Sequence, residues 1–274
     1  MLRASLLAIG NELLNGAIQD THVFFLSRQL THLGFCVEYA AMVRDQPSSI
    51  ATLLHTLLES EPDILICSGG LGPTDDDLTL TALAQALDLP LEFNAAAFAQ
   101  MQTHYERLWA QHYLAEKDPP EVARKMAVLP QGARPLANPL GTAPGVQLRY
   151  GPTHIYVLPG VPAELEAIFS DVIAPELQAH FEVSVWIEGA LLIHCDDEAQ
   201  IAPVLHAVVQ RHPAVYLKSL AEPFQTEKEG LRVIAGVHAK ETQTAQSAVE
   251  QTLTDLHRTA EAAGLRVTRI LAND

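Results

Sequence analysis

The sequence feature best suited to chemistry is a glycine-rich segment with an acidic end, Ser68-Gly69-Gly70-Leu71-Gly72-Pro73-Thr74-Asp75-Asp76-Asp77. Glycines let backbone N–H groups approach a phosphate closely, Thr74 can donate a hydroxyl hydrogen, and a following helix N-terminus offers further N–H groups. The segment is neither a Rossmann GxGxxG nor a Walker motif, because the glycine spacing differs and the Walker lysine is missing. A glycine loop that simply ends in an acidic helix cap would look the same, so both interpretations stay open.

Three consecutive carboxylates, at residues 75–77, would repel a phosphate unless a cation lay between them. One of them can cap the following helix, where its charge interacts favourably with the helix dipole. Another can hold a divalent ion, because such ions prefer carboxylate oxygens and can bridge a diphosphate. The sequence favours neither role over the other.

Further acids follow the first two predicted strands. Glu12 and Asp20 come after the strand at residues 2–9, and Asp45 comes after the strand at residues 35–43. Ligands of doubly wound sheets bind at the carboxyl ends of the strands, so we expect these carboxylates to converge with Asp77 beside the glycine loop. Asp20 has an alternative role as the N-cap of the helix that begins at Thr21.

Two later segments are unusually rich in turn-forming residues. They span residues 138–145 and 158–162, and each adjoins the end of a predicted strand. Rigid loops of this kind present fixed backbone amides to a ligand, although hairpin connections can have the same composition.

The elements that position these residues alternate along the chain. Apolar runs predict strands at residues 2–9, 35–43 and 63–68, separated by a helix over 21–33 and a second helix that is capped by Ser48 or Ser49 and ends before Pro62. This order predicts right-handed crossovers and an α/β fold with a doubly wound, mostly parallel sheet. Later elements are helices at 78–87, 94–114 and 162–181 and two strands, 146–150 and 154–158, around the turn at Gly151-Pro152.

The last third of the chain predicts a second, smaller α+β domain. Strands are expected at residues 183–194, 214–219 and 231–239, with a helix capped by the acids at 196–198 and another over 243–263. We therefore expect a ligand-binding α/β domain at residues 1–180 and a small domain at residues 181–274.

The composition limits the possible partners. The chain of 274 residues has 33 acidic and 17 basic residues and a formal net charge of −16, which makes nucleic acid a poor partner. A bound phosphate would have to be held by backbone N–H groups, a helix N-terminus or a metal ion. No apolar run reaches the roughly 18 residues of a membrane span, and three cysteines without CxxC spacing fit a reducing compartment, so we expect a soluble, cytoplasmic protein without a membrane partner.

Five segments in the same order resemble motifs of one known family. They are residues 8–14, 69–74, 76–79, 138–145 and 158–162. The sequence is similar to the competence/damage-inducible protein CinA family, whose N-terminal domain is of the molybdopterin-binding type shared with MogA, MoaB and MoeA. Beyond residue 180 the chain is similar in length and element order to the small KH-like domain of that family. It has no GxxG there and is acidic, so we do not expect it to bind RNA.

The resemblance implies a domain that binds a nucleotide or a pterin-like phosphate compound, and a metal-dependent ADP-ribose pyrophosphatase activity. The expected cofactor is a divalent metal ion, with a monovalent cation as a further candidate. A binding protein for molybdopterin or a nucleotide without turnover is the alternative. We also expect a homo-oligomer, namely a dimer, and a third interpretation makes the chain chiefly an assembly module that forms this homodimer through its small domain. Longer family members carry a nicotinamide-mononucleotide deamidase domain, which we do not expect here.

The candidate site residues combine local chemistry with motif position. Asp77, Asp45 and Glu12 are the catalytic candidates, and Asp20, Asp76 and Asp77 are the metal candidates. The ligand-binding candidates are Gly10, Asn11, Ser68, Gly69, Gly70, Gly72, Thr74, Asn138, Gly141, Thr142, Pro159 and Gly160, with Arg124 and Lys125 as charge partners of a diphosphate. Where the family has Asp-Thr-Asn, this chain has Asp20-Thr21-His22, and we expect His22 to be a solvated helix residue rather than a ligand contact.

Overall fold

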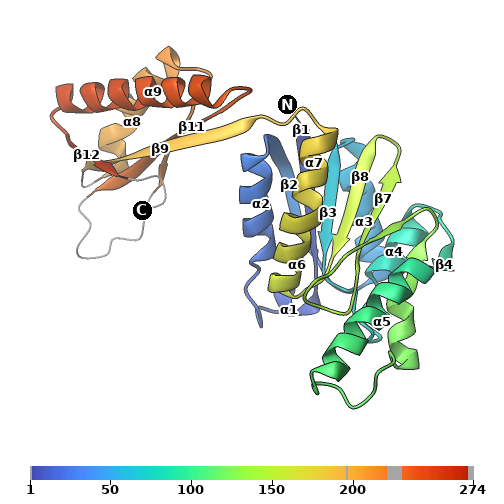
Figure 1. Ribbon diagram of the computed structural model, residues 1–274. Coiled ribbons are helices and arrows are strands. Elements are labelled where there is room, and N and C mark those ends of the chain that lie inside the picture. Colours follow the sequence, from blue (N-terminus) through green and yellow to red (C-terminus); the bar gives the residue numbers. More distant parts are fainter. Residues whose placement is uncertain (1, 196, 221–229, 271–274) are drawn as a thin grey trace. The chain divides into compact units, whose positions relative to one another are not determined.

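The computed structural model describes residues 2–195, 197–220 and 230–270 (Figure 1). The chain divides into two compact units, which we call the large unit (residues up to 31 and 35–182) and the small unit (residues 32–34 and from 183 onward). Each unit has a sheet and a hydrophobic core of its own.

The large unit is built on a six-stranded sheet. Its strand order is β2 (Phe35–Val43), β1 (Leu2–Ile9), β3 (Ile64–Ser68), β8 (Thr153–Leu158), β7 (Gly145–Tyr150) and β6 (Arg134–Leu136). The first four strands run parallel, and the last two are antiparallel to their neighbours. The expected α/β fold with a mostly parallel sheet is therefore confirmed.

Helices cover both faces of this sheet. Figure 1 shows α2 (His22–His32), α6 (Pro162–Ile168) and α7 (Ala174–His180) over one face, and α3 (Pro47–Glu59) and α4 (Thr79–Ala86) over the other. Helix α3 buries Ile50, Leu54 and Leu57 at helical spacing against the sheet. Each such side chain contributes about 1.5–3 kcal/mol through the apolar area that it removes from water.

Several short elements of the large unit differ from the expectation. Elements that we do not predict are α1 (Asn11–Leu14), the two-stranded sheet of β4 (Leu91–Phe93) and β5 (Val128–Pro130), and the 3₁₀-helix η1 (Glu121–Ala127). The helix predicted over residues 94–114 is present as α5 (Ala95–Ala110). Three-residue strands are too short for a period of two to be recognised in the sequence. The predicted cap of α3 at Ser48 or Ser49 is wrong, because Gln46 is the N-cap residue and Pro47 lies in the first turn.

The helix expected over 162–181 is divided by a wider turn. Residues Phe169–Ile173 form the π-helical segment η2 between α6 and α7, and Pro175 follows in the first turn of α7. Proline has no N–H and its ring clashes with the carbonyl four residues earlier, which disfavours a regular α-helix at this point. A π-turn relieves that clash without ending the helix.

The small unit is a four-stranded antiparallel sheet with two helices. Its strand order is β10 (Tyr216–Leu220), β11 (Leu231–Ala239), β9 (Val185–His194) and β12 (Arg266–Ile270), with helices α8 (Glu198–Arg211) and α9 (Thr242–Ala262). The smaller α+β unit is as expected, except that β12 was not foreseen. Asp197 caps α8 by accepting a hydrogen bond from the Ala199 N–H, and Asp196 lies outside the described residues.

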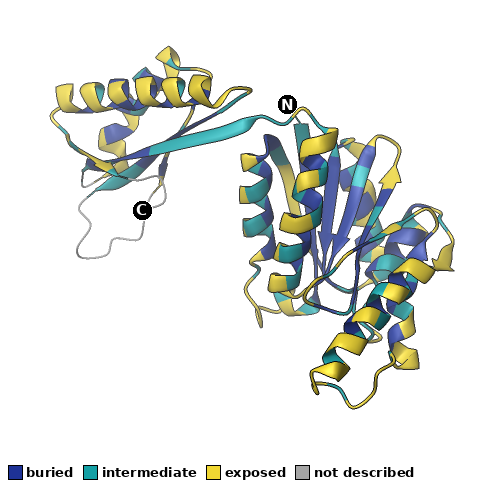
Figure 2. Ribbon diagram, in the orientation of Figure 1, coloured by how far each residue is buried: buried dark blue, intermediate teal, exposed yellow. Residues whose placement is uncertain are grey.

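Helices α8 and α9 contact the sheet with one side only. Their buried residues include Ile201, Val208 and Leu256, which pack on Ile193 and Val233 of the sheet. Figure 2 shows that α9 is buried along one side and exposed along the other. Within the described part of the chain, no helix is both long and apolar enough to cross a bilayer.

Candidate functional site

The glycine loop folds tightly over the end of strand β1. Gly69 and Gly70 follow β3 with φ of 99° and 66°, a region that side chains other than glycine rarely adopt. A Cβ on Gly69 would collide with the carbonyl oxygen of Ile9, and a Cβ on Gly70 would collide with the Thr79 hydroxyl. The Thr79 hydroxyl instead donates to the Gly69 carbonyl oxygen at 2.8 Å, which fixes the loop to the first turn of α4. Only glycine fits at these two positions.

A cavity of about 380 Å³ lies at the carboxyl edge of the sheet and gathers many of the expected residues. It is bounded by the ends of β1, β3 and β8 and by the loops that follow them. The candidates that line it are Gly10, Glu12, Asp45, Gly69, Gly70, Gly72, Asp76, Asp77, Thr142, Pro159 and Gly160. Four segments distant in the sequence, around residues 10, 70, 142 and 160, thus share one cavity.

Carboxylates crowd one side of this cavity. Asp45 accepts a hydrogen bond from the backbone N–H of Asn11 at 2.7 Å, so Asn11 positions a carboxylate instead of lining the cavity. Burial raises the pKa of Asp45, and the charges of Glu12 and Asp76 raise it further, although the Asn11 hydrogen bond opposes them. The acids therefore interact through the cavity, and a cation there would relieve their repulsion.

The acidic step after the glycine loop turns back on Thr74. The Thr74 hydroxyl lies 2.5 Å from Asp76 Oδ1 and 2.6 Å from Asp77 Oδ2, and its backbone N–H donates to Asp77 Oδ2 at 2.8 Å. The Thr74 hydrogen bond lowers the pKa of Asp76. Helix α4 has Leu78 as its N-cap residue and no side-chain cap, so the expected helix-capping role of these acids is wrong.

Asp20 takes the alternative role considered for it. Its Oδ2 accepts a hydrogen bond from the Val23 N–H at 3.1 Å, as an N-cap of α2 does, and Asp20 does not line the cavity. Its other oxygen, Oδ1, is buried without a hydrogen-bond partner among the described residues. Asp20 is thus set apart from the other two metal candidates, Asp76 and Asp77, which line the cavity.

The expectation of a solvated His22 is wrong. This side chain is only 8% exposed, and its Nδ1 lies 3.3 Å from the hydroxyl of Ser68, the last residue of β3. Burial lowers the pKa of His22, while the charges of Asp20, Glu166 and Glu12 raise it. The sequence held a signal for this burial, because His22 shares a helix face with the apolar Leu26 and Leu30 at a spacing of four.

Asn138 shapes the loop that reaches the cavity at Thr142. Its side-chain amide donates to the Ala143 carbonyl oxygen and to Glu164 Oε2, both at 2.7 Å, and its Oδ1 accepts from the Gly141 N–H at 2.8 Å. Gly141 packs under the Glu164 carboxylate, where a Cβ would collide with it. Glu164, in the first turn of α6, lines the cavity and was not among the expected residues.

The two expected cations lie beside the cavity instead of in it. The Arg124 guanidinium stacks over the Phe93 ring at 4.6 Å, and Lys125 donates a hydrogen bond to the Thr74 carbonyl oxygen. Neither lines the cavity, although the next residue, Met126, does. Within the described ranges, the lining has no lysine or arginine.

Comparisons with known proteins place the chain in a family. Residues 5–179 match the family described as "Probable molybdopterin binding domain". A protein from Caldivirga maquilingensis is 35% identical over 260 residues, which cover 93% of this chain and 95% of that protein. A protein from Pyrobaculum arsenaticum is 35% identical over 248 residues, covering 90% of this chain and 91% of its own length.

The fold of the large unit has a solved counterpart. The crystal structure of the protein CinA from Thermoplasma acidophilum, described as having unknown function, matches with a TM-score of 0.57 and 32% identity. That match covers 64% of this chain and 98% of the CinA chain, in agreement with the resemblance seen in the sequence motifs. The chain therefore belongs to the probable molybdopterin binding domain family, and it carries that domain in a CinA-like form.

Proposed function

We propose that the cavity binds the phosphate groups of a nucleotide or a pterin compound. The observation that carries this proposal is the placement of Gly10, Gly160 and three glycines of the loop around one cavity. Backbone N–H groups are the phosphate ligands available where lysine and arginine are missing, and glycine lets a ligand approach them closely. Gly10 and Gly69 already donate their N–H groups to the carbonyl oxygens of Val43 and Leu158, at 3.0 and 2.9 Å, so among the described glycines of the cavity those of Gly70, Gly72 and Gly160 are left for a ligand. The molybdopterin-binding family supports a small phosphorylated ligand of this class.

Acids on the same cavity indicate that a phosphate would enter together with a cation. Glu12, Asp45, Asp76, Asp77 and Glu164 all line it. These are hard oxygen donors of the kind that Mg²⁺ and similar ions prefer. Burial raises the pKa of Asp45 most, and the charges of Glu12 and Asp76 add to that rise. Asp76 and Asp77, whose carboxylate oxygens lie 2.5 and 2.6 Å from the same Thr74 hydroxyl, are the residues that would hold the ion.

A diphosphate hydrolase is the activity that this combination supports best. A divalent ion held there would polarise a phosphoryl oxygen and lower the pKa of a water molecule. Asp45 is the candidate general base, because its raised pKa suits it to accept a proton and it lies on the cavity wall. The Asn11 N–H fixes the orientation of this carboxylate.

The hydrolase proposal is tested by incubating the purified chain with ADP-ribose and Mg²⁺, Mn²⁺ or Co²⁺, with and without K⁺. We expect AMP and ribose 5-phosphate as products, resolved by ³¹P NMR, and a loss of at least a hundredfold in rate for Asp45→Asn. Intact ADP-ribose with every ion would contradict the activity. The matched control is Asp63→Asn, at the opposite end of β3, where Asp63 accepts a hydrogen bond from the Arg3 N–H.

A binding protein without turnover is the second candidate. One observation favours it: among the described residues, no three His, Cys, Asp or Glu side chains converge in a geometry that could hold a metal ion. Under this alternative, calorimetry would detect tight binding of a nucleotide or pterin phosphate, Asp77→Asn would leave the affinity intact, and no product would form.

A further inference from the structure

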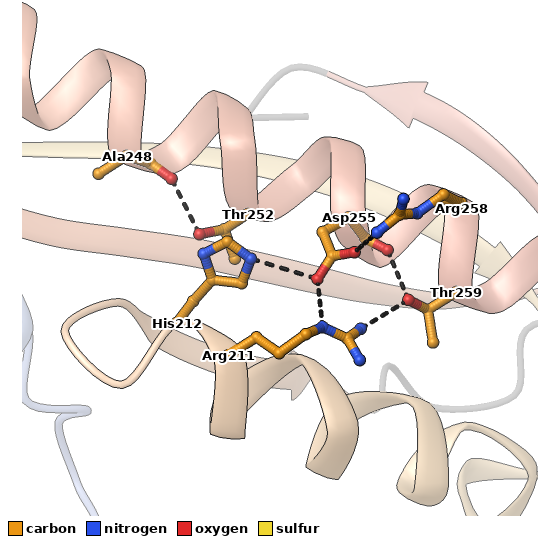
Figure 3. Close-up of polar contacts among 7 residues, drawn as sticks. All are labelled: Arg211, His212, Ala248, Thr252, Asp255, Arg258 and Thr259. Carbon is orange, nitrogen blue, oxygen red and sulfur yellow. Dashed lines mark hydrogen bonds and ion pairs between the residues drawn. The ribbon is translucent and has the colours of Figure 1, made fainter.

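A second polar cluster lies in the small unit, where the end of α8 meets α9. Its centre is Asp255, which is 8% exposed. Asp255 Oδ2 accepts hydrogen bonds from Arg211 Nε at 2.7 Å and from His212 Nε2 at 3.2 Å, and Oδ1 accepts one from Arg258 Nη2 at 2.6 Å (Figure 3). Three basic side chains therefore share one carboxylate, and both of its oxygens are occupied.

The basic groups keep donors that the carboxylate does not use. Arg211 Nη2 donates to the Thr259 hydroxyl at 2.8 Å, which fixes the plane of its guanidinium (Figure 3). Among the described residues, Arg211 Nη1, Arg258 Nη1 and His212 Nδ1 have no hydrogen-bond partner. The Arg211 and Arg258 side chains are 46% and 80% exposed, so these donors are accessible to a ligand.

The surface in front of these donors is hollow. A cavity of about 560 Å³ is lined by Arg211, His212 and Arg258 together with Gln251 and Thr254. Glu250 also lines it, but Arg269 of β12 binds that carboxylate and offsets its charge. Together with Arg269, the charged side chains around this cavity therefore have a positive net charge, although the formal net charge of the whole chain is −16.

We propose that this cavity is a second anion site, which binds the phosphate group of a small phosphomonoester. Arginine presents a planar fork of donors that matches phosphate oxygens. Arg211, Arg258, His212 and the Thr254 hydroxyl together offer more donors than the two oxygens of a carboxylate ligand would use, which favours a phosphate. Asp255 and Thr259 hold Arg211 in place before any ligand arrives, which reduces the entropy that binding would cost. The volume leaves room for the organic part of the ligand beside the phosphate.

The site is tested by NMR titration of the ¹⁵N-labelled full chain with inorganic phosphate and with ribose 5-phosphate, in chloride buffer at constant ionic strength. We expect saturable shifts of the Gln251 and Thr254 amide signals with both probes, tighter for the phosphomonoester. Acetate at the same concentration should leave these signals unchanged. Equal shifts with acetate would overturn the assignment to phosphate.

Two arginine variants separate a built site from general charge. Arg258→Ala, at an 80% exposed position, should raise the dissociation constant at least tenfold, and Arg258→Lys should give an intermediate value. The control is Arg28→Ala, which removes the same charge from an exposed position on α2 of the large unit and should leave the titration unchanged. Wild-type affinity in Arg258→Ala, or an equal loss in Arg28→Ala, would refute the proposal, and circular dichroism confirms that each variant is folded.

Discussion

The Nδ1 of His22 lies 3.3 Å from the hydroxyl of Ser68, and this contact joins the first turn of α2 to the residue that precedes the glycine loop. Both side chains are buried, at 8% and 3% exposed. The position of Gly69 and Gly70 over the end of β1 therefore depends on a helix that is 46 residues away in the sequence. Two contacts thus fix the loop: His22 holds the preceding residue, Ser68, and the Thr79 hydroxyl binds the Gly69 carbonyl oxygen.

Removing this contact should destabilise the large unit. His22→Ala leaves the Ser68 hydroxyl without its buried partner and opens a void, so we expect the free energy of unfolding to fall by about 2–3 kcal/mol. Urea unfolding followed by circular dichroism measures the change. The control is His206→Ala, an exposed position on α8, where a change above about 0.5 kcal/mol is not expected. Equal effects of the two variants would contradict the buried role of His22.

The same histidine should make stability depend on pH. Burial lowers the pKa of His22 below its ordinary value of 6.5 in the folded protein, so the unfolded chain takes up the proton first as the pH falls. The stability contributed by neutral His22 is complete above pH 6.5 and is lost as the pH falls below it. We expect the free energy of unfolding to fall less between pH 7 and pH 5 in His22→Asn than in the wild type. Parallel curves would show that His22 does not titrate in this way.

Asp255 should stabilise the folded protein through its charged form, whereas His22 does so through its neutral form. Hydrogen bonds from Arg211, Arg258 and His212 outweigh its desolvation and lower its pKa to about 2, so its stabilising charge is present above pH 4 and is lost as the pH falls toward 2. The arginines are partly exposed and screened by water, so we expect Asp255→Asn to cost about 1–2 kcal/mol at pH 7. The control is Glu261→Gln, which is 63% exposed and should change stability by less than about 0.5 kcal/mol. Thermal unfolding at pH 7 would refute the prediction if both variants behaved alike.

Gly160 offers a way to alter the cavity without altering the fold. A Cβ at this position would meet only the Gly69 Cα, at 3.5 Å, which is ordinary van der Waals contact. Because Gly160 lines the cavity, Gly160→Ala should lower ligand affinity about tenfold, equivalent to about 1.4 kcal/mol, while the melting temperature stays unchanged. Calorimetry with ADP-ribose measures the affinity, and unaltered binding would mean that the ligand does not reach this wall.

The large elements of the fold were predictable because their signals are local. The continuous apolar run of β3 and the glycines after it indicate a buried parallel strand and a loop at its carboxyl end, which is where the cavity lies. The apolar stripe of α3 similarly predicts a helix covering the sheet. The strands β4 and β5 could not be predicted from the sequence. Each has three residues, which are too few to show a pattern, and only their pairing with each other in the folded chain defines them as strands.

Side-chain placement was less predictable than the backbone. Arg124 carries a charge that suits a diphosphate, but the rings of Phe93 and Phe98 hold it beside the cavity. The Glu164 carboxylate, which lines the cavity, is oriented by a hydrogen bond from Asn138, 26 residues earlier. The Asp255 cluster joins residues more than 40 positions apart, so it depends on how α8 packs against α9. Such contacts are properties of the packing, and no sequence spacing reveals them.

We propose above that the backbone N–H groups of the glycine loop and of Gly160 bind phosphate. The most direct measurement is an NMR titration of the full chain with ADP-ribose and Mg²⁺, observing the backbone amide signals of Gly70, Gly72 and Gly160, whose N–H groups donate to no other described residue. We predict saturable shifts of these three signals, with a weaker apparent affinity when Mg²⁺ is replaced by EDTA, because five carboxylates line the same cavity. If the three amides do not respond at millimolar ADP-ribose with Mg²⁺ or Mn²⁺, the proposed phosphate site is wrong.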